Sequence, residues 1–284
     1  MNHGAKVGIQ GRIAGPFLKW AGGKNSLLSQ FTPLLPPVGS YKRYFEPFLG
    51  GGAVFFSLQP EHAYLTDLNH ELIEVYRIVR DDVERLIEAL HRHYNDHDYF
   101  YRVRAWSPAD LSPVERAARF IFLNRTCYNG LYRVNRAGQF NVPFGRYANP
   151  TICDEPTLRT ASAALQNAHL AELDFERATE HAQQGDLIYF DPPYHPLSLT
   201  SSFTSYTSSG FAAAEQMRLA ELFCALDKRG CYLMLSNSTA PLIRRLYDGF
   251  HVHEVDARRA INSNGDGRGV IKEYLITNFD AQAL

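Results

Sequence analysis

Apolar and polar residues recur along this chain with two different periods, and each period predicts a different kind of element. Short apolar runs bounded by turn residues predict strands at 41–48, 63–69, 187–190, 231–237, 250–257 and 270–279. Apolar residues at helical spacing predict helices at 71–92, 112–124 and 211–230, and the glycines at 50–52 open a further helix. Because helices separate the strands, we expect an α/β protein with a mostly parallel sheet and helices on both faces.

Residues 95–160 depart from this alternation. After the helix at 112–124 the chain is rich in Asn, Gly, Tyr and Arg, and we expect a hairpin around 139–144. Loops of this kind often carry exposed functional groups. We therefore predict a flexible leader at 1–14, a core domain formed by 15–67 and 161–284, and an inserted, mainly helical domain at 68–160.

The composition is that of a globular protein, since 45% of the 284 residues are hydrophobic and 21% are charged. The sequence has no apolar run near the roughly 18 residues that suggest a membrane span, so we expect no membrane segment. The four cysteines form no C-x-x-C pair and have no metal-ligand spacing. This predicts free thiols in a reducing cytosol, with neither zinc nor disulfides.

The net charge of −1 conceals a separation of charge along the chain. Residues 1–45 contain six lysines and arginines and 116–153 contain six arginines, and neither segment contains an acidic residue. Residues 61–98, by contrast, carry ten acidic residues against four arginines. This pattern suggests one side that faces an anion. Charge alone leaves both a nucleic-acid partner and a solvated surface open, because blocks in sequence need not form patches in space.

The segment FLKWAGGKNS at 17–26 is close to a phosphate-binding loop but fails that pattern at two positions. The pattern requires Gly where this chain has Leu18, and Ser or Thr where it has Asn25. Its glycines still allow close approach of a ligand, and Trp20 and Lys24 supply an aromatic face and a cation. A plain turn is the alternative interpretation.

A second glycine turn, in FEPFLGGGAVFF at 45–56, follows a predicted strand and opens a helix. Such a turn can bring a cofactor close to a helix start, although the G-x-G-x-x-G spacing of dinucleotide sites is missing. Asp67 ends the next strand after about 20 residues, where a carboxylate can accept hydrogen bonds from ribose hydroxyls. An ordinary glycine turn, with Asp67 as a helix N-cap, is the alternative.

The segment LIYFDPPYHPL at 187–197 places an acid, two prolines and a tyrosine where a buried strand must stop. At the carboxyl end of a central parallel strand, Asp191 is expected to face the ligand crevice. Pro192 and Pro193 leave carbonyl oxygens around them available as acceptors, and Tyr194 offers a flat face for stacking. These groups predict a pocket for a planar amine. An Asp-capped proline turn is disfavoured, because three separate features of the chain agree.

The motifs together resemble the Dam-like family of S-adenosylmethionine-dependent adenine-N6 DNA methyltransferases. The resemblance lies in FLKWAGGK, FEPFLGGG, NRTCYNGLYRVNRAGQFNVPFGRY, YFDPPY and RRAINSNG, which follow the family's order across residues 16–280. The most specific stretch is NGLYRVNRAGQFNVPFGRY. The resemblance implies a Rossmann-like methyltransferase fold with an inserted, mainly helical DNA-recognition domain. It also implies transfer of a methyl group from S-adenosylmethionine to adenine N6 in double-stranded DNA, within GATC and without a metal.

The resemblance also assigns residues by position. It implies a cofactor set of Trp20, Lys24, Glu46, Phe48, Gly50, Asp67 and Asp191, a catalytic set of Asp191, Pro192, Pro193 and Tyr194, and a DNA-binding set of Lys19, Tyr128, Asn129, Leu131, Arg133, Pro143, Arg146 and Tyr147. Two departures from the family pattern bear on cofactor affinity and phosphate contacts. Gly51 stands where relatives often have alanine, and Ala148-Asn149 replaces a basic pair.

The implied chemistry needs no metal, but adenine N6 is a poor nucleophile because its lone pair is delocalised into the ring. Hydrogen bonds from N6 to the Asp191 carboxylate and the Pro192 carbonyl would localise that density and allow direct attack on the sulfonium methyl. Flipping the base costs a few kcal/mol, and stacking on Tyr194 returns about 1 to 3 kcal/mol. Tyr128 is expected to fill the vacated space and Arg133 to read a guanine edge. For each arginine, a phosphate contact or a solvated charge is the alternative.

Three other functions are alternatives. RNA and cytosine-N4 methyltransferases use related motifs, and residues 124–147 argue against both. An inactive relative that only binds DNA is disfavoured by the intact motif at 191–194 and by Asp67. The expected partner is double-stranded DNA, with a partner restriction endonuclease left open. We expect a monomer or weak dimer in the cytoplasm, associated with the nucleoid.

Overall fold

The computed structural model describes residues 14–37, 39–197, 211–258 and 270–281. Nearly all of the expected leader and of RRAINSNG lies outside these residues. The chain divides into two compact units, each assembled from separate segments. The helical unit runs to Gly23 and includes Gly50–Gln59 and Asn69–Glu172, whereas the sheet unit comprises Lys24–Leu49, Pro60–Leu68 and the chain from Leu173 onward. The functional division at 68–160 stays a prediction.

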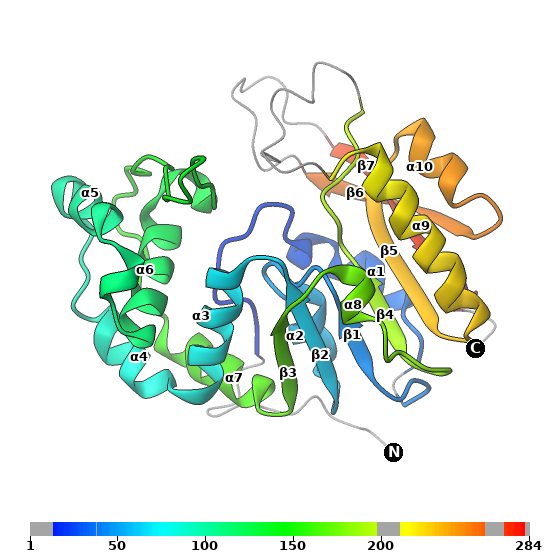
Figure 1. Ribbon diagram of the computed structural model, residues 1–284, viewed down its shortest axis with the longest axis horizontal. Helices are drawn as coiled ribbons and strands as arrows, with labels where there is room; N and C mark the ends of the chain where they lie inside the picture. Colours follow the sequence, from blue (N-terminus) through cyan, green and yellow to red (C-terminus); the bar gives the residue numbers. More distant parts are fainter. Residues whose placement is uncertain (1–13, 38, 198–210, 259–269, 282–284) are drawn as a thin grey trace. The chain divides into compact units, whose positions relative to one another are not determined.

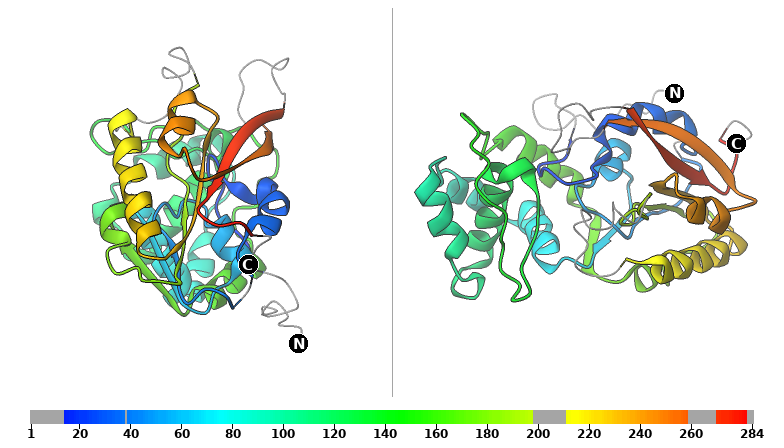
Figure 2. Two further views of the ribbon diagram at one scale, coloured as in Figure 1. Left: turned by 90° about the vertical axis from the view of Figure 1, so that its right-hand side faces the viewer. Right: turned by 90° about the horizontal axis from the view of Figure 1, so that it is seen from above.

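The sheet unit contains a mixed, mostly parallel sheet. Its strands are β1 (Tyr44–Glu46), β2 (Ala63–Asp67), β4 (Leu187–Phe190), β5 (Tyr232–Ser238), β6 (His251–Arg258) and β7 (Val270–Thr277). They lie in the order β2-β1-β4-β5-β7-β6. Strands β2, β1, β4 and β5 run parallel, and β7 runs antiparallel to both β5 and β6. Figure 2 shows the β6–β7 pair in orange and red. The predicted Rossmann-like α/β class is confirmed.

The core of this unit explains the apolar run before Asp191. All four residues of β4 are buried, and a strand buried on both faces has no polar alternation. Ile188 and Phe190 pack in one cluster with Leu233 and Leu235 of the neighbouring β5. Because β4 lies between β1 and β5, the residue that follows it emerges at the carboxyl edge of the parallel strands.

Helices surround this sheet. They are η2 (Lys24–Leu27), α1 (Leu28–Phe31), η3 (Thr32–Leu34), α8 (Phe175–Ala178), α9 (Ala213–Lys228) and α10 (Pro241–Leu246). Figure 1 shows α9 running alongside β5. Its buried residues Leu219, Phe223 and Leu226 join the core cluster, as the predicted helix at 211–230 requires.

The helical unit is built around one long buried helix. Its elements are α2 (Ala53–Leu58), α3 (His70–Asp81), α4 (Val83–Leu90), α5 (His97–Ala105), η4 (Pro108–Asp110), α6 (Pro113–Thr126), η5 (Tyr128–Gly130), α7 (Glu155–Leu165) and β3 (Ala168–Glu172). Helix α6 packs against α3, α4 and α5 (Figure 1). It begins with a capping box between Ser112 and Glu115 and has Pro113 in its first turn, which fixes its start.

Two details of the prediction were wrong in this unit. The expected single helix at 71–92 is two helices, because Asp82 leaves the helical region with φ −145° and ψ 43°. Aspartate is a poor interior helix residue, since its short side chain competes for backbone groups. The hairpin turn lies earlier than predicted: Asn135 N donates to Gln139 O, and the Asn135 side chain caps the turn. Helices α5 and α7 and strand β3 were not predicted.

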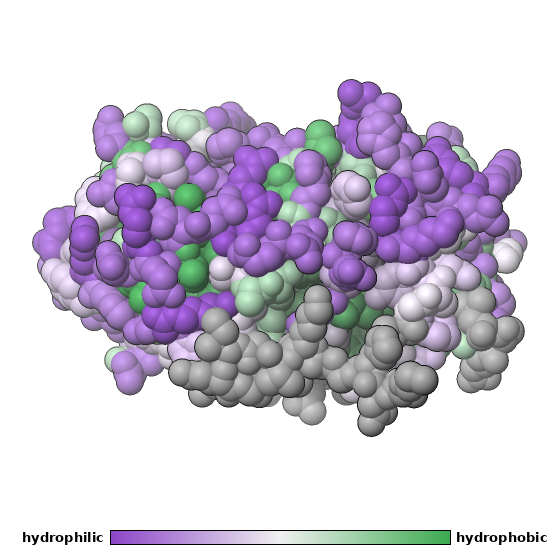
Figure 3. Space-filling model, turned by 90° about the horizontal axis from the view of Figure 1, so that it is seen from below, coloured by the Kyte–Doolittle hydropathy of each residue, from purple (hydrophilic) through white to green (hydrophobic). Residues whose placement is uncertain are grey.

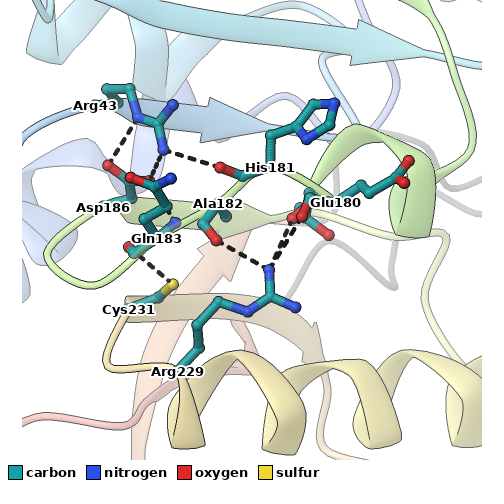
Figure 4. Close-up of polar contacts among 9 residues, drawn as sticks. Arg43, Glu180, His181, Ala182, Gln183, Asp186, Arg229 and Cys231 are labelled. Carbon is teal, nitrogen blue, oxygen red and sulfur yellow. Dashed lines mark hydrogen bonds and ion pairs between the residues drawn. The ribbon is translucent and has the colours of Figure 1, made fainter.

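A polar cluster holds the amino ends of the parallel strands, opposite the edge where Asp191 emerges (Figure 4). Asp186, immediately before β4, is buried and accepts from Arg43 Nε at 3.1 Å and from the backbone N–H of Gln183 at 2.7 Å. Arg43 also donates to His181 O at 2.9 Å, and Arg229 donates to Ala182 O at 2.9 Å. Two guanidinium groups therefore hold the loop that leads into β4.

Several large hydrophobic side chains of the described residues are exposed. The face drawn in Figure 3 is largely hydrophilic, with small hydrophobic areas between. Large exposed hydrophobic residues of the described chain include Leu68, Tyr94, Trp106, Tyr128 and Met217. In the parts of the chain that the structure describes, every helix is too short or too polar to cross a membrane.

Candidate active site

An ion pair forms at the carboxyl edge of β4. Lys24 Nζ lies 2.7 Å from Asp191 Oδ1, and the two side chains are 4% and 20% exposed. Lys24 begins η2, so the glycine turn before it delivers a cation to the acid that ends the central strand. The same amine lies 4.9 Å from the centre of the Tyr194 ring. The structure thus brings together three of the predicted site residues.

The environment of Asp191 pulls its pKa in opposite directions. Burial raises the pKa of Asp191 above its ordinary value, the Lys24 cation opposes that rise, and the carboxylate of Glu273 adds to it. Desolvation is the largest of these effects. Lys24 is therefore the group that favours the ionised carboxylate in a site that otherwise disfavours it.

Tyr194 is held at its hydroxyl end by a residue that the sequence analysis missed. Its hydroxyl donates to Glu273 Oε2 at 2.8 Å, from strand β7. Burial, followed by the nearby Asp191 and Glu273 carboxylates, raises the pKa of Tyr194 well above the ordinary value. The phenol consequently stays protonated, and its ring is fixed between a cation on its face and an acceptor at its tip.

The carbonyl of one of the two prolines is bonded within the protein. The Pro193 carbonyl was expected to be available to a substrate, but it accepts from Gln216 Nε2 of α9 at 2.9 Å. Pro192 is buried and Pro193 is exposed. The acceptor predicted for a ligand is therefore used inside the protein at Pro193, and that role stays a prediction for the Pro192 carbonyl.

Residues predicted for the cofactor lie at the ends of two further strands of the sheet unit. Glu46, the last residue of β1, is buried and accepts from Tyr44 Oη at 2.7 Å. Phe48 stacks on Phe175 with 5.6 Å between ring centres. Asp67 is the last residue of β2, and the N-cap of α3 is Asn69, whose side chain accepts from Leu72 N. The capping role that was the alternative for Asp67 belongs to Asn69.

In the helical unit, Trp20 and Gly50 are in contact. Gly50 has φ +47°, and a Cβ there would lie 2.7 Å from Trp20 Cδ1. The indole ring stacks with Tyr132 at 5.9 Å between centres. A side chain at position 50 would displace the indole ring, so the glycine and the tryptophan are required together.

Lys19 is fixed in this unit by Asn124, another residue that the sequence analysis missed. Asn124 Oδ1 accepts from Lys19 N at 2.9 Å, and Asn124 Nδ2 donates to Lys19 O at 2.7 Å. The same Nδ2 donates to Gly130 O at 3.1 Å. The Lys19 amine lies 4.1 Å from the centre of the Tyr147 ring, and burial lowers the pKa of Lys19.

The remaining residues predicted to contact DNA lie in the loop after α6 and are largely exposed. The Tyr128 side chain is 47% exposed, and Asn129 and Arg146 are exposed with positive φ. Exposed Pro143 accepts from Tyr128 N at 2.8 Å, which ties the two ends of this loop together. Leu131, by contrast, is buried at 4% exposure and packs in the core of the helical unit.

Arg133 is paired with a residue of the same loop. Its Nε donates to Asn141 Oδ1 at 2.6 Å, which orients the guanidinium plane. In the described residues, no cluster of His, Cys, Asp or Glu side chains could hold a metal ion, and all four cysteines are free.

The missed residues Glu273, Gln216, Asn237 and Asn124 share one property. Each is a polar residue within an apolar strand or helix pattern, and each bonds to a segment far away in sequence. A polar residue at a core-facing position was the available signal, because buried polar groups require partners. The partner itself could not be read from local spacing.

The parallel sheet, with an acid-Pro-Pro-Tyr loop at the carboxyl edge of its central strand, defines a methyltransferase of the Rossmann-like class. The sequence model of the D12 class N6 adenine-specific DNA methyltransferases matches residues 20–261. The chain belongs to this family, which confirms the resemblance and makes DNA the substrate and adenine N6 the methylated position.

Relatives cover nearly all of the chain. It is 46% identical to the type II methyltransferase M1.LlaDCHI of Lactococcus lactis, over 93% of this chain and 95% of that protein. It is equally similar, at 46%, to the type II methyltransferase M.MjaIII of Methanocaldococcus jannaschii, over 93% of this chain and 99% of that protein. The DNA adenine methylase of Escherichia coli K12 is 36% identical over 91% of this chain and 93% of that protein.

We expect Lys24→Met to raise the pKa of Asp191 further. The substitution keeps an apolar chain of similar length but removes the cation that favours the carboxylate, leaving burial and Glu273 to act unopposed. Carbon-detected NMR titration of the Asp191 carboxyl group measures this directly. Lys272→Met is the matched control, because Lys272 pairs with Asp256 at 2.6 Å. An Asp191 midpoint that is unchanged or lowered in Lys24→Met would contradict the opposing role of this cation.

Proposed function

We propose that this enzyme transfers a methyl group from S-adenosylmethionine to N6 of adenine within GATC in duplex DNA. Its activity would be that of a site-specific, adenine-specific DNA methyltransferase that flips its target base and lets N6 attack directly. The observation that carries this proposal is the Lys24–Asp191 ion pair beside the Tyr194 ring, at the carboxyl edge of β4. It supplies an ionised acceptor and an aromatic face in one place.

Asp191 and Tyr194 suit the amino group and the ring of an extruded adenine. The Asp191 carboxylate is partly exposed and accepts a hydrogen bond from N6, and the Pro192 carbonyl accepts the second. Two acceptors withdraw the N6 lone pair from the purine ring and aim it. The Tyr194 ring, fixed at its hydroxyl by Glu273, stacks on the base and returns about 1 to 3 kcal/mol of the flipping cost.

The chain's polar groups also suit the proposed cofactor. S-adenosylmethionine, when bound, supplies an electrophilic methyl group on a positively charged sulfur. Asp67, which ends β2 and is not the cap of α3, accepts from ribose hydroxyls, and Glu46 and Phe48 lie at the end of the adjacent β1. The proposed cofactor set also includes Trp20, Gly50, Lys24 and Asp191.

The ionisation of Asp191 also bears on the proposed reaction. Burial raises its pKa, which strengthens the carboxylate as an acceptor, while Lys24 opposes that rise and favours the ionised form that binds the N6 hydrogens. Tyr194 stays protonated, so it offers a neutral ring to the base. When N6 bonds to the methyl carbon, the C–S bond would break with its electron pair going to sulfur, and N6 would become positively charged. The adjacent carboxylate would stabilise that charge until N6 releases one proton to solvent.

The loop after α6 supports sequence recognition. We assign the DNA contacts to Lys19, Tyr128, Asn129, Leu131, Arg133, Pro143, Arg146 and Tyr147, and target recognition to residues 68–160, with catalysis in 15–67 and 161–284. Tyr128 is exposed and available to fill the space of the flipped base. Leu131 is buried, and its contribution is to anchor the loop. Arg133, oriented by Asn141, can present two donors to a guanine.

Further expectations follow from a DNA substrate. We place the enzyme in the cytoplasm, associated with the nucleoid, as a monomer or weak dimer. A partner restriction endonuclease is in keeping with the type II names of two relatives. The alternatives of methylating RNA or cytosine N4 are disfavoured by the adenine-specific DNA family to which the chain belongs.

A labelled-methyl assay tests the proposal. Wild-type enzyme with S-adenosylmethionine should label duplexes that contain GATC and leave matched duplexes with one altered base pair about tenfold or more less labelled. Digestion to nucleosides should give N6-methyl-2′-deoxyadenosine as the labelled product. Equal labelling of both duplexes would remove GATC specificity, and label on cytosine or only on RNA would overturn the proposal.

Asp67→Asn should weaken the binding of S-adenosylmethionine by about tenfold or more, because a charge-assisted hydrogen bond to a ribose hydroxyl contributes about 1.5 to 3 kcal/mol. Calorimetric titration measures the dissociation constant. Asn69→Ala is the control for lost stability, since it removes the α3 cap and costs about 1 kcal/mol. Unchanged cofactor affinity in Asp67→Asn would exclude Asp67 from the cofactor site.

Arg133→Ala should reduce discrimination at one guanine of the site, by a factor that corresponds to about 1 to 3 kcal/mol. The measurement is the ratio of kcat/KM on GATC to that on duplexes altered at each guanine. Arg136→Ala, an exposed residue of the same loop, should weaken all duplexes alike. If Arg133→Ala also lowers every duplex equally, Arg133 contacts the phosphate backbone instead.

A further inference from the structure

The loop that follows β4 is held from inside the sheet unit by two side-chain amides. Gln216 Nε2 of α9 donates to Pro193 O at 2.9 Å, and Asn237 Nδ2 of β5 donates to Gln216 Oε1 at 3.0 Å. Both amide side chains belong to residues that are 0% exposed. Completely buried amides are costly unless every donor and acceptor is used, so this chain of bonds requires an explanation.

The other side of Tyr194 is held by the same chain. Asn237 Oδ1 accepts from His195 N at 3.1 Å and from Ser238 N at 2.8 Å. Ser238 Oγ then donates to His195 O at 2.6 Å. The backbone immediately before Tyr194 and the backbone immediately after it are both fixed to α9 and β5.

The direction of these bonds is determined by chemistry. A proline carbonyl only accepts, so Gln216 must turn its NH₂ group toward Pro193 and its oxygen toward Asn237. Asn237 must then offer its own NH₂ group to Gln216, which leaves its oxygen for the two backbone N–H groups. Reversing either amide would oppose two oxygens or two donors. We call this directed set of bonds the amide relay.

We propose that Gln216 and Asn237 are positioning residues for methyl transfer. The amide relay fixes the backbone on both sides of Tyr194, and through it the placement of the Tyr194 ring and of Asp191 three residues earlier. The proposal rests on the proposed function of Asp191 and Tyr194. A displacement of reacting groups by about 1 Å can cost about a hundredfold in rate, so a loop fixed at both ends supports catalysis directly.

The relay differs from the other contacts of the loop because it carries no charge. Lys24 and Glu273 hold the Asp191 and Tyr194 side chains by ionic or charge-assisted contacts. Amides at the backbone add no field to a site in which Lys24 sets the ionisation of Asp191. Replacing Gln216 by its acidic isostere therefore changes the direction of the relay and introduces a charge, with little change of volume.

Gln216→Glu is the decisive variant. When ionised, its carboxylate faces the Pro193 carbonyl without a proton to donate, so the loop loses its contact and kcat should fall by about tenfold or more at about pH 8. When protonated, the carboxyl group donates to Pro193 O and accepts from Asn237, which restores the relay. Burial raises the pKa of such a carboxyl group. The ratio of the Gln216→Glu kcat to the wild-type kcat should therefore rise as the pH is lowered to about 6.

Two further variants separate positioning from general stability. Gln216→Met has no titratable group, so its kcat should be reduced without recovery at lower pH. Asp186→Asn weakens the buried Arg43–Asp186 pair at the opposite end of β4 (Figure 4). It should lower the melting temperature yet leave kcat per folded molecule unchanged. Because Gln216→Met adds no charge, its kcat reports the loss of the relay without any change in the ionisation of Asp191 caused by a new carboxylate.

The outcomes are distinct. Lower kcat in both Gln216 variants, with KM for DNA and cofactor within about twofold of wild type and recovery in Gln216→Glu alone, supports the relay. A kcat within about twofold of wild type in Gln216→Met, or a loss in Asp186→Asn equal to that in the Gln216 variants, overturns it. Should Gln216→Glu fail to fold, Gln216→Met decides alone. If the wild-type enzyme does not methylate adenine, the proposed function is wrong. That result is distinct from the kcat ratios of the variants, which test the relay.

Discussion

The ion pair between Lys24 and Asp191 is the interaction on which the site depends. Lys24 is 4% exposed and Asp191 follows a fully buried strand, and burying either charge without a partner of opposite sign is costly. Each therefore explains the presence of the other. The pair also joins the start of η2 to the end of β4, so folding the sheet unit and assembling the candidate catalytic groups are one event.

Around this pair the loop is held by contacts of two kinds. Charged groups orient side chains, as Glu273 does for the Tyr194 hydroxyl, whereas neutral amides orient backbone, as Gln216 does for Pro193. This division limits the number of charges near Asp191. A second charge at the backbone would shift the ionisation of Asp191, and an amide does not. At the far end of the same strand, where nothing needs a defined pKa, the protein uses two arginines instead.

The sequence allowed the fold class and the family to be predicted because the signals were local. The apolar run of β4 and the helices predicted at 112–124 and 211–230 each depend on residues close together in the chain. The missed helices α5 and α7 are short, and their aspartate caps at 96 and 154 are local signals that the sequence analysis did not use. The predicted helix at 71–92 failed because apolar periodicity continued across Asp82 while the backbone did not.

Within the candidate site, the sequence predicted the site residues but not the residues that hold them in place. Asp191 and Tyr194 stand out beside two prolines, and Asp67 stands out at the end of a strand. Glu273, Gln216 and Asn237 do not, because their partners lie between 21 and 79 residues away. Long-range pairing is a property of the assembled sheet. The pKa of Asp191 likewise depends on burial and on Lys24, and the spacing of residues in the sequence reveals neither effect.

The bonds between Asn124 and Lys19 bear on how specificity can be exchanged between relatives. Two segments 105 residues apart are joined by paired amide contacts, and the absence of a side chain at Gly130 makes room for the lysine. A graft of the loop after α6 alone would bring Gly130 but would leave behind both Lys19 and Asn124, which lies in α6 itself. A chimaera between members of this family therefore has to exchange Lys19, the end of α6 and the loop after it as one matched set, although these segments are far apart in the sequence.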